Sequence, residues 1–69
     1  MDNSDRLFEK ALGDMRAAKA RGANRKSQLW HGKNMVRLHR DNYCDEGARI
    51  VLTSEQYDAI DRRLERTRA

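Results

Sequence analysis

The small stock of large apolar side chains limits this chain more than any other feature. Leu, Ile, Val and Phe together supply eleven of its 69 residues. Domains of this size bury only about 60% of the surface of the unfolded chain, so many depend on a metal, a disulfide or a partner subunit. The single cysteine excludes an internal disulfide and is typical of a reducing, cytosolic setting. We therefore expect one small domain, residues 1–69, whose thin core is stabilised by formation of a homodimer.

An amphipathic helix is expected near the start of the chain. Its apolar positions recur at intervals of three and four residues, at Phe8, Ala11, Leu12, Met15 and Ala18. Asn3, Ser4 and Asp5 are each suitable N-caps. Gly22 suits the C′ position, because glycine readily adopts the left-handed conformation that ends many helices. Gly13 either weakens this helix by about 1 kcal/mol or allows a second helix to approach closely.

The dimer interface is expected on this first helix. Phe8, Leu12 and Met15 form its large apolar stripe. Small residues allow two helices to come close together, and the same helix contains four alanines, Ala11, Ala17, Ala18 and Ala20. We therefore predict that the stripe packs against a second copy of the chain.

The segment 23–33 allows two interpretations of equal weight. Asn24 could cap a short helical turn that runs through Trp30 and ends at Gly32. The same residues could instead form a loop, and the segment contains too few apolar residues to decide between the two.

Two short strands are predicted next. Apolar and polar residues alternate from Met35 to Arg40 and again from Ala48 to Thr53, which is typical of strands. The intervening DNYCDEG ends in Gly47 and suits a hairpin loop. After it, Thr53 and Gln56 have the spacing of a capping box that opens a last helix. The predicted fold is therefore α+β, with a helix, a two-stranded antiparallel hairpin and a helix.

The last helix is expected to bury one face and expose the other. Its apolar stripe contains Tyr57, Ile60 and Leu64. The charged residues of the opposite, solvent-exposed face are Asp58, Asp61, Arg62 and Glu65.

Positive charge is concentrated in one stretch, from Met15 to Arg40. It contains eight Lys or Arg and two His, whereas all eleven acidic residues lie outside it. Solvated faces more often mix the two signs, so we expect this stretch to contact a partner. Arg and Trp are enriched at interfaces, although Trp30 could instead complete a core that is short of aromatic residues. The predicted partner-binding residues are Arg25, Lys26, Trp30, His31, Arg37 and Arg40.

No pattern in the chain is typical of catalysis or of metal binding. His31, His39 and Cys44 do not have the spacing of a zinc site. Cys44 precedes Asp45 and Glu46, and neighbouring acids disfavour a reactive thiolate. We therefore expect neither an enzyme nor a metal or cofactor. No apolar run approaches the roughly 18 residues of a membrane span, so a membrane partner is not expected.

In outline the chain resembles the small early-region proteins of temperate bacteriophages. The resemblance rests on its 69-residue length, the polar start MDNSDRLFEK, the basic middle RGANRKSQLWHGKN and the absence of a catalytic motif. In format it is similar to the quorum-sensing anti-activators of Mu-like Pseudomonas phages. This resemblance implies a protein of the host bacterial cytoplasm that binds a LuxR-type transcriptional activator and blocks its binding to DNA. It also implies inhibition of the ATPase that assembles type IV pili.

Two other classes of function fit parts of the sequence. A pI of about 9.7 suits a small DNA-binding regulator. The segment ARIVLTSEQYDAIDRRL resembles the strand and first helix of ribbon-helix-helix repressors, although the second helix of that family does not follow here. A structural virion protein, such as a head-joining factor, also suits a helix, hairpin and helix. Our prediction is a protein-binding inhibitor of a host protein, with only weak, non-specific affinity for nucleic acid.

Overall fold

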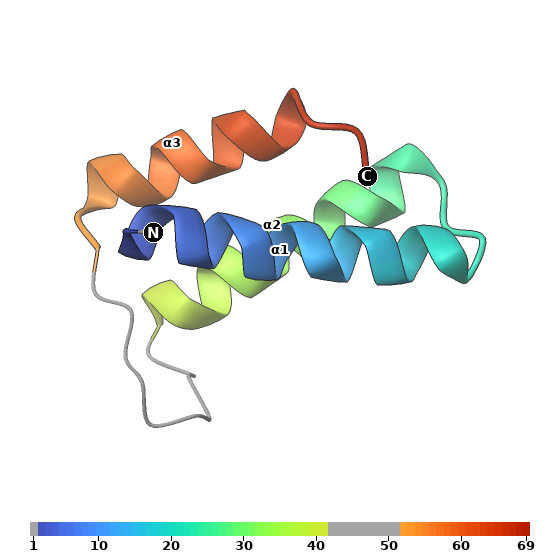
Figure 1. Ribbon diagram of the computed structural model, residues 1–69, viewed down its shortest axis with the longest axis horizontal. Helices are drawn as coiled ribbons and strands as arrows, with labels where there is room; N and C mark the ends of the chain where they lie inside the picture. Colours follow the sequence, from blue (N-terminus) through green and yellow to red (C-terminus); the bar gives the residue numbers. More distant parts are fainter. Residues whose placement is uncertain (1, 42–51) are drawn as a thin grey trace.

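A computed structural model describes residues 2–41 and 52–69, which form a bundle of three helices. Helix α1 comprises Asn3–Ala20, α2 comprises Arg25–Arg40 and α3 comprises Ser54–Glu65. Successive helices run in opposite directions, so the end of α1, the start of α2 and the end of α3 lie at the same end of the bundle (Figure 1).

The core lies where the three helices meet. Helix α1 provides most of it, and α2 and α3 pack against its apolar face. The buried members of the core are Leu7, Phe8, Ala11, Leu12, Met15, Val36, Tyr57, Ile60 and Leu64. Four partly buried residues pack against this core, namely Leu29, Met35, Leu52 and Ala69.

Both ends of α1 are capped by local hydrogen bonds. The N-cap is Asp2, one residue before the predicted candidates, and its carboxylate accepts a bond from the Asp5 amide at 2.9 Å. At the other end Gly22 has a φ of +90°. Its amide bonds the Lys19 carbonyl at 2.9 Å, and the Ala23 amide bonds the Ala18 carbonyl at 3.0 Å. These two bonds form a Schellman motif, so the prediction of Gly22 as the C′ residue is confirmed.

Helix α2 corrects the prediction of a first strand. Asn24 is an N-cap, as one of the two interpretations of 23–33 expected, and accepts a bond from the Ser27 amide at 2.9 Å. The helix does not end at Gly32 but continues to Arg40. The predicted strand from Met35 to Arg40 is therefore wrong, and so is the α+β fold class, because the described residues form helices and no strand.

The alternation around Val36 and Leu38 suggested a strand, whereas the buried face of α2 follows helical spacing. That face contains Gly32, Val36 and His39, at spacings of four and three residues. A glycine and a histidine do not contribute to a hydrophobic pattern, so only Val36 marks it in the sequence.

Most of the remaining predicted hairpin lies outside the residues that the structure describes. Residues 42–51, which include the loop with Gly47 and most of the second predicted strand, lie outside those described. Of that strand, Leu52 packs against the core, and Thr53 is the N-cap of α3 rather than a strand residue.

Helix α3 begins with the predicted capping box. The Thr53 amide donates to Gln56 Oε1 at 2.8 Å, and the Gln56 amide donates to Thr53 Oγ1 at 3.2 Å. Its predicted apolar stripe, Tyr57, Ile60 and Leu64, is buried in the core. The opposite face is not uniformly exposed, because Asp61 is half-buried.

Arg63 joins α3 to α1. Its guanidinium carbon lies 3.7 Å from the centre of the Phe8 ring. The same side chain donates to Asp5 Oδ1 at 3.1 Å. A cation–π contact and an ion pair therefore fix this side of the bundle.

Candidate functional site

All six predicted partner-binding residues lie on α2. Lys26, Trp30 and Arg37 share one outward face with Lys33, because spacings of four, three and four residues bring side chains to one side of a helix. We call these four residues the Trp30 face. His31 is half-buried beside this face, whereas Arg25 and Arg40 contact α3.

Trp30 is the most unusual residue of the face. Its exposed fraction is 59%, and it is the one exposed large hydrophobic residue in the described part of the chain. The indole meets the His31 ring edge to face, with ring centres 5.0 Å apart. Trp30 therefore does not complete the core of this chain, and its role as an interface anchor stays a prediction.

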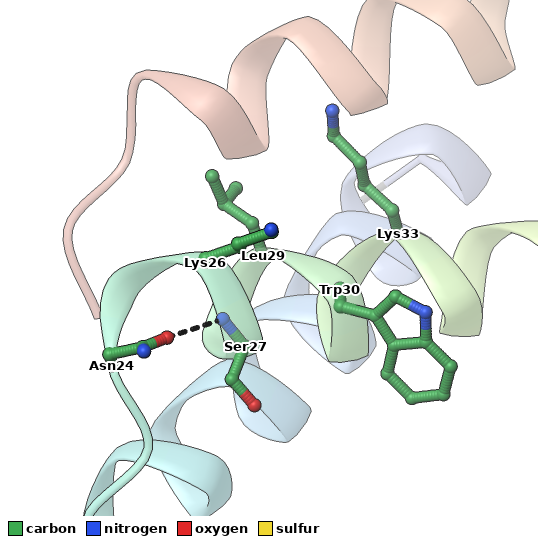
Figure 2. Close-up of a pocket in the computed structure, with 6 residues that line it drawn as sticks. All are labelled: Asn24, Lys26, Ser27, Leu29, Trp30 and Lys33. Atoms are coloured by element: carbon green, nitrogen blue, oxygen red, sulfur yellow. Dashed lines mark hydrogen bonds between the residues drawn. The ribbon is translucent and has the colours of Figure 1, made fainter.

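Two shallow hollows flank the Trp30 side chain. The first has a volume of about 610 Å³. Figure 2 shows its lining, with the Trp30 ring projecting from the helix and Leu29 and Lys33 extending toward α3. The second, of about 180 Å³, is lined by Trp30, Lys33, Asn34 and Arg37. Trp30 and Lys33 therefore line both hollows.

The cations of the Trp30 face differ in how far they are neutralised. Lys33 Nζ lies 2.6 Å from Glu65 Oε1. Arg37 donates to the uncharged Asn34 Oδ1 at 2.9 Å. The Lys26 side chain has no hydrogen bond or ion pair with any other residue in the described ranges. Two of the three cations thus have no carboxylate partner within residues 2–41 and 52–69.

A row of carboxylates borders the Lys33 side of this face. It is formed by Asp58, Asp61 and Glu65, at spacings of three and four residues on α3, and we call it the carboxylate row. Oδ1 of Asp61 is buried and has no hydrogen-bond partner among the described atoms. Burial raises the pKa of Asp61, and the nearby Lys33 partly opposes this effect. By contrast, the hydrogen bond from Lys33 lowers the pKa of Glu65.

Arg25 holds the start of α2 against the end of α3. Its guanidinium donates to the carbonyl oxygens of Thr67 at 2.6 Å, Glu65 at 2.8 Å and Leu64 at 3.3 Å. A helix end leaves its last carbonyls without helical partners, and Arg25 satisfies that of Glu65. Thr67 follows α3, and the Leu64 carbonyl also accepts a bond from the Thr67 amide at 3.1 Å. Arg25 is therefore committed to an intramolecular contact.

Arg40 is also engaged within the chain. Its guanidinium carbon is 5.8 Å from the centre of the Tyr57 ring, and its Nη1 is 3.9 Å from Asp58 Oδ1. The basic stretch therefore separates into cations that join α2 to α3 and cations that face outward.

The sequence prediction missed Lys33 and Leu29 as members of this site. Recognition of 25–40 as one helix would have placed Lys33 beside Lys26, Trp30 and Arg37, because the signal is their common spacing. Leu29 is distinguished only by its packing against the core beneath the first hollow.

The stripe predicted to form a dimer interface is buried inside one chain. Phe8, Leu12 and Met15 have exposed fractions of 4%, 5% and 0% and pack in the core. A homodimer stays a prediction, and it would have to use a surface other than this stripe.

The described residues contain no group of three or more His, Cys, Asp or Glu side chains that could hold a metal ion. His39 is buried, and its Nδ1 lies 3.1 Å from the Met35 carbonyl oxygen. Cys44 lies outside the described residues. None of the helices in residues 2–41 and 52–69 has the length and apolar character needed to cross a membrane.

Comparisons with protein families, with curated proteins and with solved structures give no match to this chain. A three-helix bundle hosts many unrelated activities, so conclusions about function rest on the site itself.

Proposed function

We propose that this protein is a non-enzymatic inhibitor that binds a host protein through the Trp30 face and masks a functional surface of it. The observation that carries the proposal is the 59% exposure of Trp30 between Lys26, Lys33 and Arg37. Tryptophan and arginine are both enriched at interfaces and among binding hot spots.

Trp30 is expected to contribute most of the affinity. Covering a large apolar side chain contributes on the order of 2 kcal/mol. An exposed ion pair contributes only about 0–1 kcal/mol. Lys26 and Arg37 would therefore set the orientation and the rate of association with an acidic surface more than the strength of binding.

The outline resemblance to phage quorum-sensing anti-activators suggests which host proteins to test. The first is a LuxR-type transcriptional activator, whose binding to DNA the protein would block. The second is the ATPase that assembles type IV pili. Both would be met in the host bacterial cytoplasm.

Capture from a nuclease-treated bacterial lysate tests the proposal. Tagged wild-type protein should retain one host protein, and Trp30→Ala should lose it. Arg62→Ala, which changes an exposed residue of α3, is the matched control and should retain the host protein. Thermal unfolding of each variant checks that the helices are intact. Equal capture by wild type and Trp30→Ala would contradict the proposal.

A small DNA-binding regulator is the second candidate. Lys26, Lys33 and Arg37 on one helix face could contact successive phosphates. The carboxylate row beside Lys33 disfavours it, because a polyanion lying across α2 and α3 would meet Asp58, Asp61 and Glu65. Capture that disappears with nuclease treatment would favour this second candidate.

A further inference from the structure

We infer that the partner segment covering the Trp30 face is an acidic amphipathic helix of about three turns. The inference rests on the proposed function, because it specifies the chemistry of what that face binds. One side of the segment would carry apolar residues and one edge would carry Asp or Glu.

The dimensions of the face favour a helix of this length. Lys26 and Arg37 are eleven residues apart, which corresponds to about 16 Å along a helix axis. Helices pack by placing the ridges of one between the ridges of the other. Trp30 and Lys33 line both of the hollows, which have volumes of about 610 Å³ and 180 Å³. Apolar side chains one turn apart on a partner helix would enter these hollows next to the indole.

The Lys33–Glu65 pair is the reason for expecting carboxylates on the partner. Lys33 Nζ lies 2.6 Å from Glu65 Oε1. A carboxylate can therefore pair with a cation of the Trp30 face while Trp30 stays exposed. Lys26 and Arg37 lie on either side of Lys33 along the same face and have no carboxylate of their own among the described residues. Two unneutralised cations therefore complement acids placed along one edge of a partner helix.

The carboxylate row favours an acidic protein segment over a nucleic acid, mainly through Asp61, because Glu65 is paired with Lys33 and Asp58 lies 3.9 Å from Arg40. Asp58, Asp61 and Glu65 border the face on the α3 side. A nucleic acid carries a phosphate at every nucleotide, so its backbone would be repelled wherever it crossed this row. An amphipathic helix can confine its acids to the edge next to Lys26 and Arg37 and place uncharged residues next to the row.

The probe that tests this inference is a fluorescein-labelled synthetic helix of about fourteen residues. Leu would occupy one face, at spacings of three and four, and Glu would occupy one edge. A second peptide, identical except for Gln in place of every Glu, is the matched control. A single-stranded oligonucleotide of similar length is the third probe. Binding to the full chain is followed by peptide anisotropy and by the emission of Trp30, which is the only tryptophan of the chain.

The acidic peptide should bind saturably and shift the Trp30 emission to shorter wavelength, because the indole leaves water. The Gln peptide should bind at least tenfold more weakly, equivalent to about 1.4 kcal/mol. Equal affinity of the two peptides, or tighter binding of the oligonucleotide at physiological salt, would overturn the inference.

Variants locate the binding on the face. Lys26→Gln with Arg37→Gln should weaken binding of the acidic peptide at least tenfold. Arg16→Gln with Arg62→Gln removes the same charge from exposed positions on α1 and α3, and should have little effect. Equal losses in the two double variants would mean that only net charge matters, and would overturn the inference.

The proposed function and this inference fail in different ways. If Trp30→Ala loses the host protein but the acidic peptide does not bind wild type, the inference is wrong and the proposed function stands. If Trp30→Ala retains the host protein, the proposed function is wrong and the inference falls with it.

Discussion

Gly32 of α2 lies so close to Met15 of α1 that a Cβ at position 32 would be 2.8 Å from Met15 Cγ and 2.9 Å from its Sδ. Met15 is fully buried, so it cannot move aside without disturbing the core. Overpacking of this kind costs about 1–3 kcal/mol. Gly32→Ala should therefore lower the free energy of unfolding, although alanine is the better helix former.

Gly13→Ala is the matched control for this variant. Apart from the backbone of its own helix and its chain neighbours, no atom of the described residues lies within 4 Å of a Cβ built at Gly13, so the close approach of helices occurs at Gly32 and not at Gly13. Alanine there should raise the free energy of unfolding by up to about 1 kcal/mol. Urea denaturation of both variants measures the difference, and equal stabilities would show that the α1–α2 contact is looser than described.

Arg25 and Lys26 are neighbours in the sequence but should behave oppositely. Arg25→Ala removes the donor to three carbonyls at the end of α3 and should lower the free energy of unfolding by about 1–2 kcal/mol. Its effect on partner binding should be small. Lys26→Ala should leave stability unchanged and weaken partner binding. Thermal unfolding and titration of the partner separate the two effects, and a stable Arg25→Ala that loses binding would reverse the assignment.

Asp61 should make the protein less stable at neutral pH. Its raised pKa means that ionisation costs more in the folded chain than in the unfolded chain. This cost is fully present above the folded-state pKa and disappears as pH falls below the unfolded value. Asp61→Asn should therefore raise the free energy of unfolding near pH 7, and the gain over wild type should shrink near pH 4.

Asp58→Asn is the control for the pH experiment, because Asp58 is exposed and lies 3.9 Å from Arg40. It should give no gain at neutral pH. A stabilisation by Asp58→Asn equal to that of Asp61→Asn would mean that burial of the Asp61 carboxyl is not the cause.

Glu65 neutralises Lys33, so removing its charge would add a third unpaired cation to the Trp30 face. Glu65→Gln removes the carboxylate that Lys33 contacts at 2.6 Å and should strengthen binding of the acidic peptide about two- to fivefold, the range expected for one exposed ion pair. Glu55→Gln makes the same change in net charge in the first turn of α3 and should not alter affinity. Anisotropy titrations of both variants decide the point, and identical gains would assign the effect to net charge.

A titration on duplex DNA tests the second candidate function. We expect weak, sequence-independent binding that is lost near physiological ionic strength. The logarithm of the affinity should fall with the logarithm of the salt concentration, with a slope of about 0.9 per phosphate neutralised. Tight binding to one operator sequence at physiological salt would instead favour a regulator.

The sequence predicts the outer helices of this fold well and the middle helix poorly. The capping box of Thr53 and the stop at Gly22 depend on neighbours in the chain, so local rules identify them. The buried face of α2 consists of Gly32, Val36 and His39, and two of these are hidden from a hydrophobic pattern. The need for glycine at position 32 comes from its contact with Met15 of α1, which is a tertiary contact that local sequence rules do not reveal.

The residues of the candidate site were also predictable only in part from the sequence. Trp30 and Lys26 could be selected from composition alone, because aromatic and basic residues stand out in the central stretch. Nothing local separates Arg25 from Lys26, since the acceptors of Arg25 lie 39 to 42 residues further along the chain. Lys33 joins the site only through the helical spacing that the predicted strand obscured.

The most direct measurement of the central claim is the affinity of purified wild type and Trp30→Ala for the host protein that the wild type captures. Loss of a central aromatic hot spot costs about 2 kcal/mol or more, so Kd should rise about thirtyfold in isothermal titration calorimetry. The melting temperature should stay the same, because the Trp30 side chain is 59% exposed and contributes little to the core. An unchanged Kd for a folded Trp30→Ala variant would contradict the account.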